Sequence, residues 1–235
     1  MIDLMKYTIA ALLLVGISHA ESRTCRVVYP ERPNDAPKMA HLFDGKESTA
    51  ITLPSMNLSE VIKLPKGDIS VVMTQQKITD PEQIPVAAPK VNIPENVSHC
   101  YIIIMPDPKN PHFPVKLNLV DAGDAKFKAG ETLWYNFTEH RILAKLGKVD
   151  FDISPKGRAI SKPPQATSGY YVARFAYMAQ GTQAAAPITE QSWWHDADHK
   201  HVGFMANTGG KLPKIYYFRD FRMKEEDEQA PPVEE

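Results

Sequence analysis

Twenty prolines recur along the chain, and they constrain its fold more than any other feature. Proline lacks a backbone N–H and its ring clashes with the preceding helical turn, so it interrupts helices. Few windows are therefore long enough for an uninterrupted helix. Apolar and polar residues instead alternate with a period of two, as in "KVDFDIS", where Val149, Phe151 and Ile153 share one face. We expect a mostly β protein in which strand exceeds helix at least about threefold.

Short segments with strand character recur every ~10–15 residues and are separated by turns rich in proline, glycine, aspartate and asparagine. One of them, "CYIIIM" (100–105), is apolar on both faces, which is typical of a strand buried between two sheets. An α/β fold would need helical patterns between the strands. The predicted fold class is therefore all-β: an antiparallel immunoglobulin-like β-sandwich, in two units, with little helix outside the N-terminal segment. Other predicted strands are 68–74, 115–120, 131–138, 140–146, 148–154 and 170–179.

Two segments suggest an internal repeat. "LPSMNLSEVIKLPKGDISV" (53–71) and "LWYNFTEHRILAKLGKVDF" (133–151) each combine an Asn-apolar-Ser/Thr-Glu step, an apolar strand, a glycine turn and another strand. Their asparagines, Asn57 and Asn136, lie 79 residues apart, which is near the size of one small sandwich. Two unrelated β-hairpins would also look alike, so both a repeat and a coincidence are open.

The N-terminal segment has the parts of a secretory signal peptide. Lys6 precedes the apolar run "YTIAALLLVGI", which is followed by the small-x-small triplet "SHA". The run is shorter than the ~20 apolar residues of a transmembrane helix, so cleavage after Ala20 is favoured over a retained membrane anchor. We expect no transmembrane span in the mature chain. The predicted location is periplasmic, associated with the cell envelope, or extracellular.

Charge is unevenly distributed. The whole chain has a formal net charge of −1, whereas the tail from Arg222 has two basic and six acidic residues and a net charge of −4. The tail has little to bury and is predicted to be disordered. The remainder is only mildly basic, which makes no electrostatic case for a nucleic acid partner. A protein or a glycan of the cell envelope is the expected partner.

Three runs carry a resemblance to a known class of proteins: "MNLSEVIKLPKGDISV", "YIIIMPDPKNPHFPVKLNLV" and "FKAGETLWYNFT". Together they resemble secreted bacterial proteins of unknown function built from immunoglobulin-like β-sandwiches. The resemblance covers residues 36–221, and it implies the fold but no active site. The predicted division of the chain is a signal peptide (1–20), a first sandwich (21–110), a second sandwich (111–222) and a disordered acidic tail (223–235).

Two cysteines, Cys25 and Cys100, are present. Export to an oxidising compartment would allow them to form a disulfide, and this is the pairing we expect. A catalytic thiol is less favoured, because neither cysteine lies in a Cys-x-x-Cys motif or beside a glycine-rich turn.

Motifs for catalysis or cofactor binding are not found. The sequence has no GxSxG, no Walker loop, no GxGxxG after a strand and no HExxH. Ser168 and Ser192 lie in no motif that would make them nucleophiles. We therefore favour a protein without enzymatic activity and expect no cofactor, although a convergent site would show no local motif.

The segment "WWHDADHKHV" (193–202) is the one concentration of metal-ligating residue types. Histidines at i and i+2 of a strand lie on one face, ~6.6–7 Å apart, and could share an ion. The same segment, however, contains the Asp-x-Asp pattern of an ordinary turn and no cysteine. We therefore predict a solvent-facing hairpin connection that binds no metal. If it did bind one, the ligands would come from His195, Asp196, Asp198, His199 and His201.

Aromatic residues complete the set of candidates. Trp193 or Trp194 is expected to bury its ring beside Phe204, and an exposed Trp193 or Trp134 could stack on a sugar. The preferred function is an exported, non-catalytic module with a binding or structural role. A metal-binding protein or metal-dependent enzyme, and a carbohydrate-binding module, are the alternatives.

Overall fold

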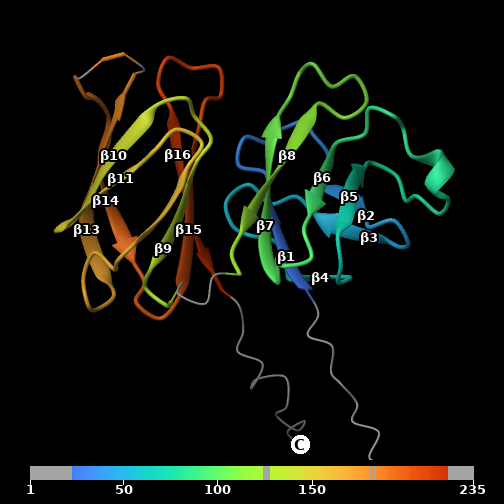
Figure 1. The fold of residues 1–235 in the computed structure, drawn as a ribbon, viewed down its shortest axis with the longest axis horizontal. Helices are drawn as coiled ribbons and strands as arrows, with labels where there is room; N and C mark the ends of the chain where they lie inside the picture. The colour runs from blue at the N-terminus through green and yellow to red at the C-terminus, as the bar shows by residue number, and fades with distance from the viewer. Residues whose placement is uncertain (1–22, 124–127, 180, 183, 222–235) are drawn as a thin grey trace, which may run out of the picture.

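The computed structural model describes four stretches of the chain: residues 23–123, 128–179, 181–182 and 184–221. It confirms an all-β protein (Figure 1). The one helical segment in these stretches is a 3₁₀ turn, η1 (Pro81–Gln83). None of their helices is long and apolar enough to cross a membrane. The predicted signal peptide and the acidic tail lie outside the described residues.

The first eight strands form two four-stranded sheets, in the orders β4-β1-β7-β8 and β3-β2-β5-β6. These strands, coloured blue to green in Figure 1, make up the first unit. Their bounds are β1 (Arg23–Val28), β2 (Met39–Phe43), β3 (Ser48–Thr52), β4 (Ile62–Leu64), β5 (Ile69–Thr74), β6 (Lys90–Ile93), β7 (His99–Pro106) and β8 (Val115–Asp121).

The other eight strands form two more sheets, in the orders β12-β9-β15-β16 and β11-β10-β13-β14. They make up the second unit, coloured yellow-green to red in Figure 1. Their bounds are β9 (Thr132–Asn136), β10 (Arg141–Leu146), β11 (Val149–Ile153), β12 (Arg158–Ser161), β13 (Gly169–Met178), β14 (Ala186–His195), β15 (Lys200–Ala206) and β16 (Lys214–Asp220).

The two units repeat one topology. Adding eight to each strand number of the first unit reproduces both sheets of the second, including the parallel pairs β1/β7 and β9/β15. The repeat suggested by the sequence was in the wrong register. Residues 53–71 run from the end of β3 into β5, whereas residues 133–151 run from β9 into β11, and the counterpart of β9 is β1. The similarity between those two segments is therefore a coincidence.

The boundary between the units differs from the predicted one. The sequence predicts a division at residue 110, but β8 pairs with β7 along its whole length and belongs to the first unit. The first unit therefore ends at Asp121 and the second begins at Thr132.

The predicted disulfide is not formed. Cys25 and Cys100 are direct register partners on the parallel strands β1 and β7, and both are buried without a disulfide between them. Side chains of such partners point the same way and stay about one strand spacing, ~4.7–4.9 Å, apart at Cβ. A disulfide holds its Cβ atoms ~3.8 Å apart, so the pairing would require the two strands to move. The two thiols instead pack in the core of the first unit.

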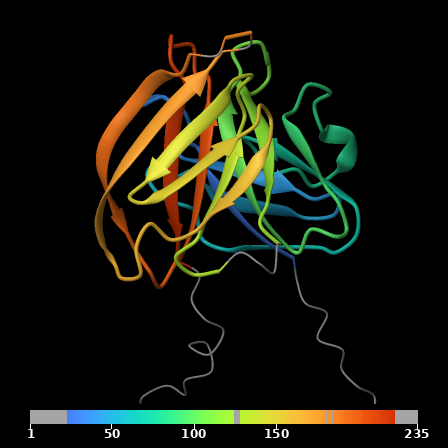
Figure 2. The ribbon, with the colours of Figure 1, turned by 60° about the vertical axis from the view of Figure 1, so that its left-hand side comes forward.

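The four sheets stack as four layers, seen nearly edge-on in Figure 1. Figure 2 brings the outer sheet of the second unit toward the viewer. Each unit has its own core between its two sheets. A third apolar cluster joins the inner sheets of the two units, with Tyr101 and Ile103 of β7 on one side and Val202 and Phe204 of β15 on the other. The inner sheets are therefore covered on both faces, and the outer sheets on one.

A buried polar network crosses the same contact. Arg26 of β1 and Asp220 of β16 form an ion pair with an Nη1–Oδ1 distance of 2.5 Å. The Tyr101 hydroxyl donates to the other oxygen of Asp220 at 2.5 Å. Arg26 Nε also donates to the carbonyl of Ser59. Among the described residues, the network therefore joins the first strand to the last.

Candidate functional site

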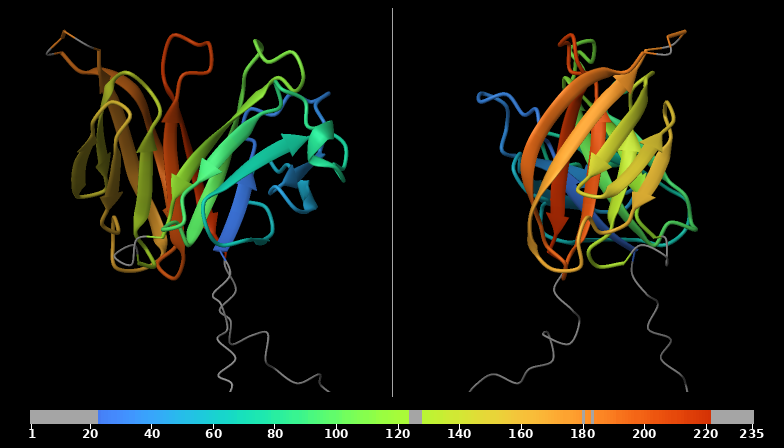
Figure 3. Two further views of the ribbon diagram at one scale, coloured as in Figure 1. Left: turned by 45° about the vertical axis from the view of Figure 1, so that its right-hand side comes forward. Right: turned by 90° about the vertical axis from the view of Figure 1, so that its left-hand side faces the viewer.

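Two hairpins shape the outer sheet of the second unit. β10 and β11 are joined by the two-residue turn 147–148, in which Gly147 has a φ of +57°, a conformation that glycine adopts at little cost. β13 and β14 have ten residues each and pair along almost their whole length. Because side chains alternate along a strand, each strand turns one set toward the core and the other toward solvent. Figure 3 (right) views this solvent face directly.

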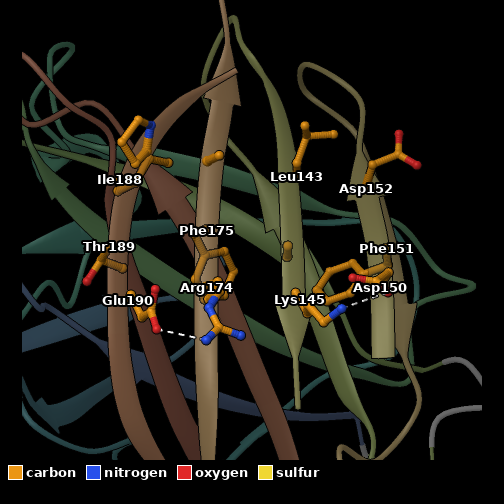
Figure 4. Close-up of a pocket in the computed structure, with 13 residues that line it drawn as sticks. Leu143, Lys145, Asp150, Phe151, Asp152, Arg174, Phe175, Ile188, Thr189 and Glu190 are labelled. Carbon is orange, nitrogen blue, oxygen red and sulfur yellow. Dashed lines mark hydrogen bonds and ion pairs between the residues drawn. The ribbon is translucent and has the colours of Figure 1, made fainter. Parts of the chain in front are cut away.

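Four charged side chains form one row across this face. Lys145 is the register partner of Asp150 on one side and of Arg174 on the other. Arg174 is in turn opposite Glu190. The Lys145–Asp150 distance is 3.5 Å and the Arg174–Glu190 distance is 2.9 Å (Figure 4). The hydrogen bond from Arg174 lowers the pKa of Glu190 below its usual value. With two anions and two cations, the row has no net charge.

A second row beside it is mainly apolar. Leu143 of β10 faces Ala176 of β13, and Asp152, opposite Leu143, is paired with Arg141 at 2.8 Å. The register between β13 and β14 shifts after Phe175, so that Ala176 is opposite Pro187 and Ile188 is passed over. The two rows line an open groove of about 730 Å³. Its wall on β14 is formed by Pro187, Ile188 and Thr189.

Two exposed aromatic rings lie further along the same face. Tyr170 and Trp194 are register partners, with ring centroids 4.9 Å apart and an interplanar angle of 79°. They are 71% and 45% exposed. Alternation places them on the same side of the sheet as Arg174 and Glu190, four residues or ~13 Å along the strands. The outer face therefore combines a groove, a row of charges and an aromatic pair.

The carboxylates of the groove, on Asp150, Asp152 and Glu190, all take part in ion pairs. The side chains offer N–H donors and carboxylate acceptors next to apolar surface, which is the composition of a recognition site.

The histidine-rich segment does not form the solvent-facing hairpin that its sequence predicted. β14 ends at His195 in the outer sheet, and β15 begins at Lys200 in the inner sheet, so residues 196–199 cross the sandwich. His201 is fully buried rather than solvated. The prediction assumed that one face of β15 meets water, but β15 belongs to an inner layer whose two faces are both covered.

His195 and His201 come together inside the second sandwich. Both are fully buried, and their ring centroids lie 5.8 Å apart. The His195 ring has no hydrogen-bond partner within the described structure, whereas the His201 ring interacts with the backbone of Glu131, and both rings lie near the charge of Asp196. Burial lowers the pKa of His195, and burial together with the neighbouring His195 lowers the pKa of His201 to about 4. Both rings are therefore neutral near neutral pH.

The other three candidate ligands lie outside this pair. Asp196 is 3.1 Å from the His199 ring and 3.1 Å from the Arg219 guanidinium. The backbone N–H of Asp198 donates to Asp196, and the Asp198 side chain is exposed, as expected of a turn. In the described stretches no group of three or more His, Cys, Asp and Glu side chains is placed to hold a metal ion.

The tryptophans are distributed differently from the prediction. Trp134 is fully buried, and Trp193 packs against it in the core of the second unit, so neither presents a ring for a sugar. Phe204 faces the opposite side of its sheet and is not beside Trp193. The exposed ring belongs to Trp194. Adjacent residues in a strand face opposite sides, and sequence alone does not say which of two neighbouring tryptophans points outward.

No protein-family model matches this chain, and no curated protein sequence matches it, so the groove and the histidine pair are interpreted from their geometry.

Proposed function

We propose that the protein is an exported, non-catalytic binding module, and that the outer face of the β11-β10-β13-β14 sheet binds a glycan chain. The observation that carries this proposal is the presence of the groove and the Tyr170–Trp194 pair on one exposed face. The groove, at about 730 Å³, is within the size range of ligand sites, and its open form suits a chain rather than an enclosed small molecule.

The charge of the face favours an uncharged polymer. The row of Asp150, Lys145, Arg174 and Glu190 is neutral, so it gives no electrostatic preference for a polyanion or a polycation. Sugar hydroxyls both donate and accept hydrogen bonds. A row that alternates carboxylate acceptors with ammonium and guanidinium donors can satisfy both roles.

The aromatic pair supplies the complementary apolar contact. A sugar ring presents C–H groups on its faces, and an indole or phenol ring offers a flat surface of matching size. Tyr170 holds Trp194 in an edge-to-face contact, which leaves both rings partly open to solvent. Such rigid aromatic side chains lose little conformational entropy on binding.

The N-terminal segment supports export. A positive residue, an apolar run and a small-x-small ending are the parts of a signal peptide, and the predicted cleavage site precedes the first strand by few residues. Glycans are abundant in the cell envelope and outside the cell, so the location and the proposed ligand class agree.

Affinity electrophoresis tests the proposal. The mature protein is run through gels containing neutral polysaccharides (a β-1,4-glucan, a β-1,3-glucan, xylan or mannan) or an anionic one such as pectate. We expect at least one neutral polymer to retard the protein and pectate to have less effect. Trp194→Ala should weaken the retardation about tenfold or more, as loss of a central aromatic contact does.

Met56→Ala provides the matched control, because Met56 is an exposed apolar residue of the first unit. It should leave the retardation unchanged. Binding that survives both Trp194→Ala and Arg174→Ala would overturn the assignment of this face, and the absence of retardation by every neutral polymer would overturn the ligand class.

A further inference from the structure

The strand β14 is a free edge of the outer sheet of the second unit. The sheet order is β11-β10-β13-β14, so β14 pairs with β13 on one side only. It has ten residues, whereas the other edge strands of the four sheets have three to seven. A long free edge displays a row of unpaired N–H and C=O groups, and native proteins protect such an edge with lysine, proline or a bulge.

Protection of this kind covers only the first half of β14. Pro187 and the register shift opposite Phe175 lie there. The second half, "TEQSWWH" (189–195), has no lysine, no proline and no register shift. In the first unit, by contrast, the counterpart edge β6 has four residues and packs against β8. The second half of β14 is therefore open to another strand.

The hydrogen-bond pattern shows which backbone groups face the free edge. The N–H of Gly147 donates to the carbonyl of Val172, so Val172 uses its backbone groups toward β10. Ser192, which is opposite Val172 on β14, consequently points its N–H and C=O away from β13. Alternation gives Glu190 and Trp194 the same direction. Within the described part of the chain, these three residues have no backbone hydrogen bond beyond the sheet.

We propose that the protein forms a homodimer in which the β14 strands of two copies pair antiparallel about a two-fold axis at Ser192. Each copy presents the same strand to the other, which is the isologous arrangement of a closed dimer. Three facing pairs form: Ser192 with Ser192, and Glu190 with Trp194 on either side of the axis. Each pair exchanges two hydrogen bonds, so every outward N–H and C=O of the three residues gains a partner.

The side chains of β14 agree with this register. Glu190 lies beside Trp194 of the second copy, and the two Glu190 carboxylates stay four residues, or ~13 Å, apart along the strands. A pairing centred on Glu190 would instead put two carboxylates directly opposite each other, which is destabilising. On the core side, Gln191 covers Trp193 of the second copy, whose ring is only partly buried in a single chain.

The dimer joins two outer sheets into one sheet of eight strands. Both grooves and both Tyr170–Trp194 pairs then lie on a single face. The pairing does not depend on the glycan proposal, but two binding sites on one face raise the avidity for a polymer without any new contact.

Sedimentation velocity of the mature protein, without any glycan, tests the pairing. Between about 1 µM and about 1 mM the wild type should change from one chain to two, because an interface built on one strand pair is small and weak. Ser192→Lys puts two like charges at the axis and should weaken the association at least about tenfold. Asn92→Lys is the matched control: it adds the same charge at an exposed position of β6, and it should leave the association unchanged.

Cysteine cross-linking tests the register. A hydrogen-bonded antiparallel pair holds its Cα atoms ~5.5 Å apart, within the range of a disulfide. Ser192→Cys should therefore give a covalent dimer with oxidised glutathione, which is reduced as the two thiols form one disulfide. Glu190→Cys, at positions ~13 Å apart in the dimer, should not. A wild type that stays monomeric at about 1 mM, undiminished association of folded Ser192→Lys, or faster cross-linking at position 190 than at 192 would each overturn the proposal.

Discussion

At the scale of single residues, Asn136 shows how one amide organises a turn. Its Nδ2 atom donates to the carbonyls of His140, Ile153 and Ser154, and its Oδ1 atom accepts from the backbone and hydroxyl of Thr138. The side chain is buried, so these groups cannot turn to water when it is removed. It also lies within an Asn-x-Thr triplet, and its burial in the folded chain leaves no access for a glycan.

Replacement of Asn136 by alanine should lower the free energy of unfolding by about 2–4 kcal/mol, because several buried groups lose their partner at once. Urea denaturation of the variant measures this loss. Asn57→Ala is the control: Asn57 is exposed, and the change should cost no more than about 0.5 kcal/mol. Equal costs at the two positions would show that the turn network contributes little.

Position 203 requires glycine, because the ring of Trp134 lies very close to its backbone. A Cβ at this position would lie 2.2 Å from Cζ3 of Trp134, which is fully buried and in contact with further aromatic rings. Gly203→Ala should therefore destabilise the protein by about 3 kcal/mol, through overpacking. Gly210→Ala, where the nearest atom is 3.9 Å away, should have little effect. Thermal unfolding of the two variants compares them, and a stable Gly203→Ala protein would contradict the close packing.

At the scale of elements, we expect the charged row of the outer sheet to contribute to ligand binding but little to the stability of the fold. Lys145, Asp150, Arg174 and Glu190 have exposed side chains, and solvent-exposed ion pairs of this kind contribute little to stability. Arg174→Gln should thus leave the free energy of unfolding almost unchanged while weakening the retardation by neutral polysaccharide. A large loss of stability in urea denaturation would instead give the row a structural role.

The strands could be predicted from sequence because their signal is local. Period-two alternation identifies "KVDFDIS" and "YYVARFAYMA" as the strands β11 and β13, and the doubly apolar "CYIIIM" lies in β7 of an inner sheet. The parallel pairs β1/β7 and β9/β15 could not be predicted. The two strands of each pair are separated in sequence by most of their unit, and no local sequence pattern indicates that they pair.

The candidate sites were predicted less well, since they depend on which faces are covered. The alternation in "HVGFMA" predicts a strand with one face exposed to solvent. Its sheet is an inner layer that is covered on both faces, so His201 is buried in a core. The groove was missed entirely. Its charges come from four strands, and they form a row only through the register that joins Lys145 to Asp150 and Arg174.

At the scale of the whole molecule, Glu31 links the units at the surface. It lies after β1, and its carboxylate accepts from Lys214 Nζ at 2.9 Å and from the Tyr216 hydroxyl at 2.6 Å. Partial burial raises the pKa of Glu31, but these two hydrogen bonds outweigh burial and hold the pKa below its usual value. A lowered pKa in the folded state adds stability above the unfolded pKa of ~4.3, and this stability is lost as the pH falls through the folded value.

Glu31→Gln should consequently cost about 1 kcal/mol at pH 7 and progressively less as the pH is lowered from about 5 to 3. Urea denaturation of wild type and variant across this pH range measures the difference. Glu82→Gln is an exposed control whose difference should stay small throughout. A Glu31→Gln cost that does not depend on pH would show that packing, not charge, makes the link.

We expect the buried network of Arg26, Asp220 and Tyr101 to couple the unfolding of the two units. It lies beside the apolar cluster that joins the inner sheets, so separating the units exposes both. Asp220→Ala would leave the buried Arg26 guanidinium without its counter-charge, and such a loss costs about 3–5 kcal/mol. We expect wild type to unfold in a single calorimetric transition and Asp220→Ala to unfold in two, with the second unit detaching first.

The double variant Arg26→Met/Asp220→Leu removes both charges and should restore most of the stability and the single transition, since a well-packed apolar pair can replace a buried ion pair. Two transitions in wild type, or a cost below about 1 kcal/mol for Asp220→Ala, would mean that the contact between the units does not couple their folding.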